Sequence, residues 1–214
     1  MKKKIDYQGL LGEANPLLNF LVLYDAALDE FSKRKFEDAS LNEILKNAKM
    51  SKGSFYHHFG DKFGLDLCMM DIVVKKKVSF FTPIIEENED SSDFFVAIKM
   101  IVRGTMGFMQ VDERFHHLFN KNMENGPALT ERLIEFFPYD FDQAFGPIIQ
   151  SAILSGQIDS RYSSHFISKI LQLLFSNSHK LLTSDDSAEE IVGVIDQLVD
   201  LMQFGISAKK EAEE

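Results

Sequence analysis

Apolar residues recur at spacings of three and four along most of this 214-residue chain, which is the period of an amphipathic helix. In the N-terminal part this pattern predicts helices over residues 20–31, 41–48, 52–59 and 61–80. Proline and glycine separate several of the later helical segments, which are expected near residues 95–109, 114–123, 128–137, 141–154, 162–182 and 188–204. We therefore predict an all-α fold.

The segment from residue 40 to residue 65 predicts two short helices joined by a tight turn, with a third helix directly after them. Ser40 and Glu43 have the spacing of a capping box, in which each side chain satisfies a free backbone donor. Ser51 can cap the second helix, and Gly60 suits a left-handed cap at its end. This layout is that of a helix-turn-helix DNA reader.

The second short helix is predicted to have one apolar side and one polar side. Phe55 and Phe59 are four residues apart, so both rings should point inward. Asp61 can cap the following helix, which places Lys62 beside a positive helix end where a phosphate could bind. The polar side carries small or hydrogen-bonding residues, with a tyrosine at its border and a lysine in the first turn: Gly53, Ser54, His57, Tyr56 and Lys52.

Residues 20–65 resemble the DNA-binding domain of the TetR family of bacterial transcriptional regulators. The family usually has a small hydroxyl residue at the start of helix 2, then SKGTLY, two variable residues, Phe and a nearby Lys. Here the matching positions are Ser40, residues 51–56 (SKGSFY), Phe59 and Lys62. The resemblance implies phosphate contacts from Ser40, Tyr56 and Lys62, and a major-groove face made by Lys52, Gly53, Ser54 and His57.

Three residues depart from the family pattern. Lys35 stands where a glycine is common, Leu45 where an alanine usually lets two helices approach closely, and Lys49 where the turn usually has a glycine. We expect a slightly altered helix crossing within the same fold.

The acidic net charge of the chain lies outside the proposed reader. Residues 1–66 hold ten basic and ten acidic residues, whereas residues 67–214 hold 13 basic and 23 acidic residues, which account for the net charge of −10. Acidic surface repels DNA at long range, so binding should depend on docking geometry. Lys2, Lys3 and Lys4 either assist as an N-terminal arm or form a solvated tail.

The sequence favours a cytoplasmic protein without a membrane partner. No stretch reaches the roughly 18 uncharged apolar residues that a membrane span needs, and the N-terminus lacks the apolar block of a signal peptide. Cys68 is the one cysteine, so no intramolecular disulfide can form. Its helical spacing with Leu65, Met69 and Ile72 predicts a buried position, and a redox-sensing thiol is the less favoured alternative.

The last two helical segments each carry an apolar stripe. In TetR-like proteins these helices pair with the same helices of a second subunit, so the resemblance implies a homodimer with two recognition helices ~34 Å apart. The stripes could instead pack inside one subunit, because periodicity does not distinguish the two arrangements. The residues expected at the interface are Phe166, Ile170, Leu174, Ile191, Ile195, Leu198 and Met202.

Aromatic and thioether residues between the reader and these helices are candidates for a ligand cavity, which the resemblance implies. The same composition describes an ordinary helical core, and for any single residue the core is the favoured interpretation. A cavity of this composition would take a small apolar or aromatic effector. The candidates are Phe108, Met109, Phe115, Phe119, Phe136, Phe137 and Tyr139.

No set of catalytic residues stands out. The chain has no glycine-rich phosphate loop, no HExxH motif and no serine elbow. His116 and His117 are neighbours, and adjacent helical residues point about 100° apart, so they are poor joint metal ligands. We expect no catalytic site, no metal and no cofactor.

These observations predict two domains: a helix-turn-helix DNA-binding domain over 1–66, and a helical ligand-binding and dimerisation domain over 67–214. The predicted function is a ligand-responsive transcriptional regulator, a repressor released from a double-stranded DNA operator by a small effector. Short helix-turn-helix shapes also occur in proteins that never contact DNA. One alternative, suggested by Lys49 in the turn and by the acidic surface, is an all-helical binding or adaptor protein that has lost DNA function. A second alternative, disfavoured because no set of catalytic residues appears, is a helical enzyme.

Overall fold

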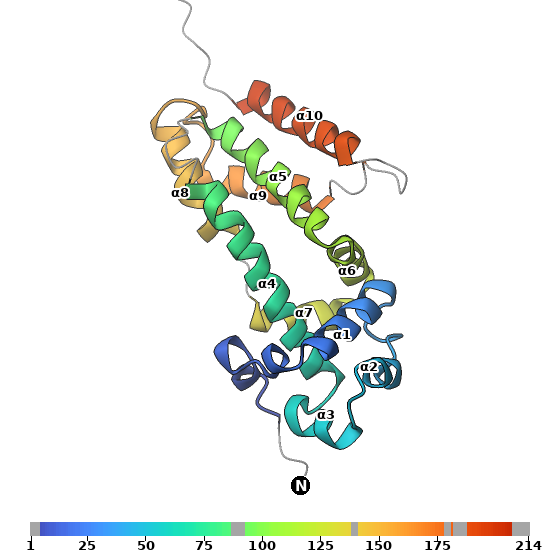
Figure 1. Ribbon diagram of the computed structural model, residues 1–214. Coiled ribbons are helices and arrows are strands. Elements are labelled where there is room, and N and C mark those ends of the chain that lie inside the picture. Colours follow the sequence, from blue (N-terminus) through green and yellow to red (C-terminus); the bar gives the residue numbers. More distant parts are fainter. Residues whose placement is uncertain (1–4, 87–92, 138–140, 178–180, 182–187, 207–214) are drawn as a thin grey trace, which may run out of the picture. The chain divides into compact units, whose positions relative to one another are not determined.

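The computed structural model of the protein describes residues 5–86, 93–137, 141–177, 181 and 188–206 (Figure 1). Helices dominate these residues, so the all-α prediction is confirmed. Three short 3-10 turns precede the first α-helix: η1 (Gln8–Leu10), η2 (Gly12–Ala14) and η3 (Pro16–Asn19). The α-helices are α1 (Leu21–Lys33), α2 (Leu41–Asn47), α3 (Lys52–Phe59), α4 (Lys62–Glu86), α5 (Phe94–Val111), α6 (Glu113–Glu124), α7 (Pro127–Phe136), α8 (Phe141–Leu154), α9 (Ser164–Asn177) and α10 (Ala188–Ile206).

The helix ends differ from the sequence-based prediction at two places. We expected the fourth helix to stop before Pro83, but α4 continues through it to Glu86. Proline removes the amide that would donate to the carbonyl four residues back, and its ring crowds that carbonyl, yet three further residues continue the helix. We expected Ser91 or Ser92 to cap α5; both lie outside the described residues, and Asp93 Oδ1 accepts from the amides of the first turn.

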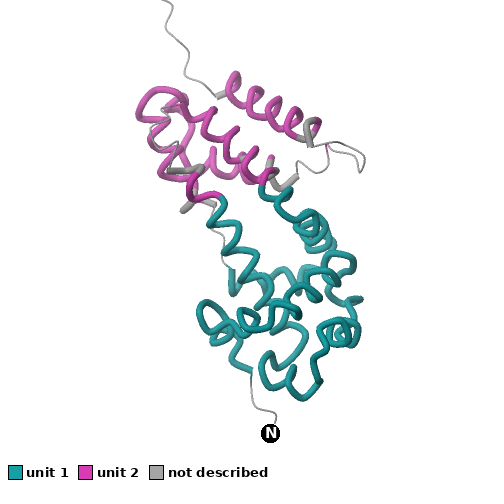
Figure 2. The backbone as a smooth tube through the Cα atoms, in the orientation of Figure 1, with its two compact units in different colours: residues 1–80, 108–138 teal, residues 81–107, 139–214 magenta. Residues whose placement is uncertain are grey.

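The chain forms two compact units (Figure 2). Unit 1 comprises Met1–Phe80 and Phe108–Pro138, and unit 2 comprises Phe81–Gly107 and Tyr139–Glu214. The units thus follow a different division from the predicted boundary at residue 66, because α6 packs on α1 and Phe136 of α7 contacts Tyr7 and Phe63. A functional boundary at residue 66 stays a prediction.

The core of unit 1 joins the helices of the predicted reader. Leu28 of α1, Ile44 of α2 and both Phe55 and Phe59 of α3 have no exposed surface. Full burial of each such side chain contributes roughly 1.5–3 kcal/mol. These short helices are therefore stable as a packed group, although each one alone would be marginal.

The segment before α1 is anchored on α4 by a buried polar network. The Asn15 amide donates to the Cys68 carbonyl at 2.8 Å and to Asp71 Oδ2 at 2.9 Å. Asp71 Oδ2 also accepts from the Gly12 amide at 3.1 Å, and Leu17 beside this network is fully buried. The sequence pattern did not predict these contacts with α4.

The core of unit 2 gathers apolar residues from α5, α8, α9 and α10. Ile149, Ile167 and Leu171 are fully buried in it. Two ion pairs join α5 to α10, between Lys99 and Asp200 and between Arg103 and Asp196. The fully buried residues and those almost fully buried form one cluster: Phe94, Phe95, Ile98, Phe145, Ile149, Ala152, Ile158, Ile167, Leu171, Ile195, Val199 and Met202.

Helix α5 is long and apolar enough, by length and composition alone, to cross a membrane, with a mean hydropathy of 1.3 over Phe94–Val111. The core helix of a soluble protein meets the same criterion. Phe95 and Ile98 of α5 are buried in the core of unit 2, and its Lys99 and Arg103 pair with α10. Part of α5 is therefore packed into the core of unit 2.

Candidate nucleic-acid interface

Helix α3 is held on unit 1 by its apolar side. The Ser51 hydroxyl accepts from the Ser54 amide at 3.2 Å, which confirms the predicted cap. The rings of Phe55 and Phe59 are fully buried and stack with 5.6 Å between their centroids. The prediction that both rings point inward is confirmed.

The opposite side of α3 is exposed and polar. Lys52, Gly53 and His57 are exposed, Ser54 is partly buried, and Tyr56 has 53% of its surface exposed. Figure 1 shows α3 beside α2 within unit 1. The fold therefore brings the predicted groove-facing residues onto one free surface, although their DNA contacts stay predictions.

Two glycines shape the connection from α3 to α4. Gly60 follows α3 at the predicted C-cap position and has φ +75°, a positive φ that glycine adopts without strain. Its ψ of −50° lies outside the left-handed helical region, so the predicted left-handed cap does not form. A Cβ atom on Gly64 would lie 2.0 Å from the carbonyl oxygen of Phe59, so only glycine allows this close approach. Asp61 Oδ1 accepts from the Gly64 amide at 2.9 Å, as expected for the cap of α4.

The turn between α2 and α3 is closed by two backbone hydrogen bonds. The Met50 amide donates to the Leu45 carbonyl at 3.0 Å, and the Lys49 amide donates to the Lys46 carbonyl at 3.2 Å. This is the Schellman arrangement, which requires a left-handed residue after the helix end. Lys49 is that residue, with φ +52°.

The predicted capping box at Ser40 is only half right. The Ser40 hydroxyl accepts from the Glu43 amide at 3.3 Å, as predicted. The Ser40 amide, however, donates to Glu30 Oε1 of α1 at 2.8 Å, and the Glu43 carboxylate lies 3.5 Å from Lys46. A carboxylate from a neighbouring helix satisfies the donor, so α2 is tied directly to α1.

Lys62 has partners within the protein that the sequence did not indicate. Its Nζ donates to the carbonyls of Phe36, Glu37 and Ala39 at 2.5, 3.1 and 2.9 Å, which uses all three ammonium donors. Burial lowers the pKa of Lys62, and the Asp38 carboxylate opposes this shift. The predicted phosphate contact stays a prediction, and it would require Lys62 to leave these carbonyls.

Asp66 lies one turn after Lys62 on α4 and has only 3% of its surface exposed. Burial raises the pKa of Asp66 to about 7, and the positive charge of Lys62 opposes the rise.

Cys68, two residues after Asp66 on α4, is fully buried, and burial raises the pKa of its thiol to about 12. A thiol that resists ionisation in this way is poorly suited to redox sensing.

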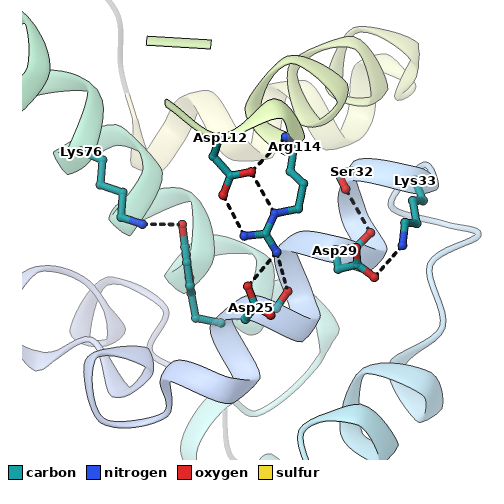
Figure 3. A network of polar contacts seen from close by, with 8 residues as sticks. Asp25, Asp29, Ser32, Lys33, Lys76, Asp112 and Arg114 are labelled. Carbon is teal, nitrogen blue, oxygen red and sulfur yellow. Dashed lines mark hydrogen bonds and ion pairs between the residues drawn. The ribbon is translucent and has the colours of Figure 1, made fainter. Parts of the chain in front are cut away.

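Helix α6 is joined to α1 by a fork of charge-assisted hydrogen bonds (Figure 3). Arg114 donates to both carboxylate oxygens of Asp112 at 2.9 and 2.7 Å, and to Asp25 Oδ1 of α1 at 2.7 Å. Asp112 also caps α6 by accepting from the Arg114 amide at 3.0 Å. These hydrogen bonds lower the pKa of Asp112. Because α5 leads directly into Asp112, the fork connects the end of α5 to the reader.

The residues expected to line a ligand cavity do not form one group. Phe108 and Phe115 are buried and stack at 4.9 Å between ring centroids. Phe136 packs instead against Tyr7 and Phe63, with ring centroids 6.1 Å apart in each pair. The other cavity candidates differ in how far they are exposed. Met109 and Phe137 are partly buried, Phe119 is 49% exposed, and Tyr139 lies outside the described residues.

The residues expected at the dimer interface divide into two groups. Ile195 and Met202 belong to the core of unit 2, and Ile170 and Leu174 pack against that core, so the intrasubunit alternative describes these four. Leu198 is partly buried, Phe166 is 47% exposed, and the side chain of Ile191 lies outside the described residues. Leu173, Leu201 and Phe204 are more exposed than any described member of the expected interface. Leu173 and Leu201 lie in the predicted apolar stripes, but the predicted interface did not include them.

The described residues contain no group of three or more His, Cys, Asp or Glu side chains that could hold a metal ion. His116 and His117 lie side by side, with ring centroids 5.6 Å apart, and both are exposed. Burial and the neighbouring His117 lower the pKa of His116. Within the described residues of unit 1, the polar side chains of the candidate interface are therefore of two kinds. Some lie on the exposed face of α3, and the others hold the helices of the predicted reader together.

Comparison with known proteins identifies the class to which this fold belongs. Residues 23–65 match the family model of bacterial regulatory proteins, tetR family. A solved TetR family transcriptional regulator from Chloroflexus aurantiacus superposes with a TM-score of 0.65 at 20% identity, covering 91% of this chain and 95% of that one. Residues 23–65 are thus similar to the N-terminal domain of the tetR family, and the helical fold of the chain is similar to that of a solved TetR family regulator.

Two further proteins are similar over different extents. The A-factor receptor protein of Streptomyces griseus is 34% identical over 59 residues, which are 28% of this chain and 21% of the receptor. The chain thus matches about a fifth of the length of that relative. A structure solved as the molecular basis for control of antibiotic production by bacterial hormones has a TM-score of 0.61 at 16% identity, covering 91% of this chain and 100% of its own.

Proposed function

We propose that this protein is a cytoplasmic, ligand-responsive transcriptional regulator, a repressor that binds double-stranded operator DNA as a homodimer. The observation that carries this proposal is the geometry of α3. Its two phenylalanines are fully buried, while Lys52, Gly53 and His57 lie exposed on the opposite side. The match of residues 23–65 to the tetR family supports assigning this exposed face to DNA.

The DNA-binding part of this proposal can be tested by selecting bound sequences from a random DNA pool with the full chain. We expect recovery of a two-half-site sequence, with half-sites about one helical turn apart. His57→Ala should alter the sequence preference, whereas Tyr56→Ala should weaken binding to all sequences. A protein that enriches no sequence would instead support the binding or adaptor alternative.

A homodimer is supported by the exposed apolar residues of unit 2. Phe166 and Leu173 of α9 are seven residues apart and both exposed, which places them on one side of that helix. Leu201 and Phe204 of α10 are 74% and 87% exposed. Large apolar side chains exposed on adjacent turns are typical of a surface that another subunit covers. Sedimentation analysis of the full chain tests this; a monomer at all concentrations would contradict it.

Effector control is supported by the nature of the relatives and by the contacts of α6. One relative is a receptor protein, and another concerns bacterial hormones. In this chain Arg114 links the start of α6 to Asp25 of α1, so a shift of α5 or α6 would reach the reader. The apolar and aromatic composition of the residues predicted to line a cavity favours an apolar or aromatic effector.

Calorimetric titration of a co-purified or screened ligand tests this control. By thermodynamic reciprocity, the effector should bind the free protein about 5- to 150-fold more tightly than the protein–operator complex. Equal affinity in the two titrations would mean that the ligand does not operate a switch. We propose no enzymatic activity for the chain.

A further inference from the structure

Lys49 occupies an unfavourable backbone conformation in the turn between α2 and α3. Among the described residues it is the one non-glycine residue with a positive φ, at +52°. Glycine adopts this conformation freely, whereas an L-residue in it carries a conformational cost. The two backbone hydrogen bonds that close the turn, from the Lys49 and Met50 amides, require the left-handed geometry but not a side chain.

The side chain of Lys49 does not offset this cost through contacts within the protein. Lys49 is exposed, and within the described part of the chain no hydrogen bond, ion pair or ring contact involves its ammonium group. Stability alone would therefore favour glycine at this position. Strained residues that packing does not explain occur mainly at functional sites.

The position of the turn indicates which function the charge could serve. In a helix-turn-helix reader the first helix crosses the DNA backbone, and the N-terminal residues of the second helix reach the base edges. The turn that joins these helices must therefore lie at the rim of the major groove, where phosphates line the strand. Lys49 is two residues before Ser51, the cap of the groove-facing helix α3.

The lysines near the turn differ from Lys49 in how their charges are used. Lys62, which the family resemblance assigns to a phosphate, has its three ammonium donors on backbone carbonyls. Lys46 is paired with Glu43 at 3.5 Å. Lys52 lies in the first turn of α3 and belongs to the groove-facing side. Lys49 is thus the cation of the turn that no described protein group engages.

We propose that Lys49 contacts a DNA phosphate at the rim of the major groove and that its strained backbone conformation is retained for this contact. The proposal rests on the DNA-binding function proposed above. It assigns a DNA role to a residue whose departure from the family pattern would otherwise favour loss of DNA binding.

Stability and binding should change in opposite directions when Lys49 is replaced by glycine. Lys49→Gly removes the strain, so its thermal midpoint should rise above that of the wild type. It should also bind the selected operator and unrelated DNA more weakly, and the slope of log affinity against log salt should become shallower by about 0.9. Lys49→Arg keeps the charge and should retain the wild-type slope. Lys33→Gln, which removes an equal charge from α1, is the control for net charge.

The outcomes separate this proposal from the proposed function. If the wild type binds the operator and Lys49→Gly binds with unchanged affinity and slope, the phosphate contact is absent while the DNA-binding function stands. If the slope falls equally in Lys33→Gln, general charge is responsible and the contact is again rejected. If the wild type binds no DNA, the proposed function fails and the contact fails with it. Weaker binding and a shallower slope in Lys49→Gly alone, with retention in Lys49→Arg, support the contact. A thermal midpoint of Lys49→Gly that does not rise above that of the wild type would overturn the claim that strain is retained for it.

Discussion

Helix α3 in unit 1 and helix α10 in unit 2 are each fixed by one buried side, but their free sides have opposite character. Phe55 anchors α3 and Ile195 helps to anchor α10, both with almost no exposed surface. The free side of α3 carries polar and small residues around Tyr56, whereas that of α10 carries Leu201 and Phe204. A polar, hydrogen-bonding face suits a strongly hydrated polyanion, while an apolar face gains free energy when another apolar surface covers it.

The units also use charge differently. In unit 1, Asp66 and Asp71 are buried, and the Arg114 fork holds two helices together. In unit 2, the side chains of the Arg103–Asp196 pair are 55% and 27% exposed. Water screens such an exposed pair, so it should contribute less to stability than the better shielded fork of unit 1.

The largest expected effect comes from the buried anchor of α3. Phe55→Ala should lower the free energy of unfolding by about 3–5 kcal/mol, because it leaves a cavity in the reader core. Tyr56→Ala removes an adjacent but exposed ring, and its cost should be within about 1 kcal/mol. Urea unfolding followed by circular dichroism measures both. Similar losses for the two variants would show that α3 is not anchored by one side.

Asp66 should make the stability of unit 1 depend on pH. The pKa of Asp66 is raised to about 7 in the folded protein, so between about pH 4 and pH 7 the folded state holds a proton that the unfolded state releases. Stability therefore falls as pH rises through this window. The shift of about three units corresponds to at most about 4 kcal/mol.

Asp66→Asn stays neutral and should remove this contribution. The unfolding free energy of the wild type should fall from pH 5 to pH 8 more steeply than that of Asp66→Asn. Denaturation curves at both pH values provide the measurement. Parallel pH profiles would mean that Asp66 is ionised at little cost in the folded protein.

The apolar face of α10 should control subunit association. Leu201→Glu places an unpaired charge on the proposed interface, which should weaken dimerisation by about a hundredfold or more, or about 3 kcal/mol. The subunit itself should stay folded, because Leu201 is 74% exposed. Gln150→Glu adds the same charge on an exposed position of α8 and should leave the dimer intact. Light scattering that finds Leu201→Glu still dimeric would place the interface elsewhere.

The smallest expected effect comes from comparing the Arg114 fork of unit 1 with the more exposed Arg103–Asp196 pair of unit 2. Arg114→Ala should cost about 1–2 kcal/mol of stability, because it removes hydrogen bonds to Asp112 and to the largely exposed Asp25. Arg103→Ala should cost less than about 1 kcal/mol. Thermal unfolding of both variants gives the comparison. Equal costs would show that the Arg114 fork contributes no more than an ordinary surface pair.

The sequence by itself determined the local features of the reader. The Ser51 cap, the Gly60 end, the Asp61 cap and the inward side of Phe55 and Phe59 were all predictable. Each depends on interactions between residues about four apart or fewer, or on the backbone freedom of one residue. The family resemblance added the fold of the whole chain, which periodicity alone described only as helical.

Only the tertiary structure decided which partner each side chain meets. Glu30 rather than Glu43 satisfies the Ser40 amide, and three carbonyls from another segment bind Lys62. Phe136 lies against Tyr7, and Ile195 belongs to the core of unit 2. Periodicity shows that a side chain points inward, but not which of several apolar surfaces covers it. The partner of a polar group is decided by which donors and acceptors come within hydrogen-bond distance, and that is set only when segments far apart in the chain have packed together.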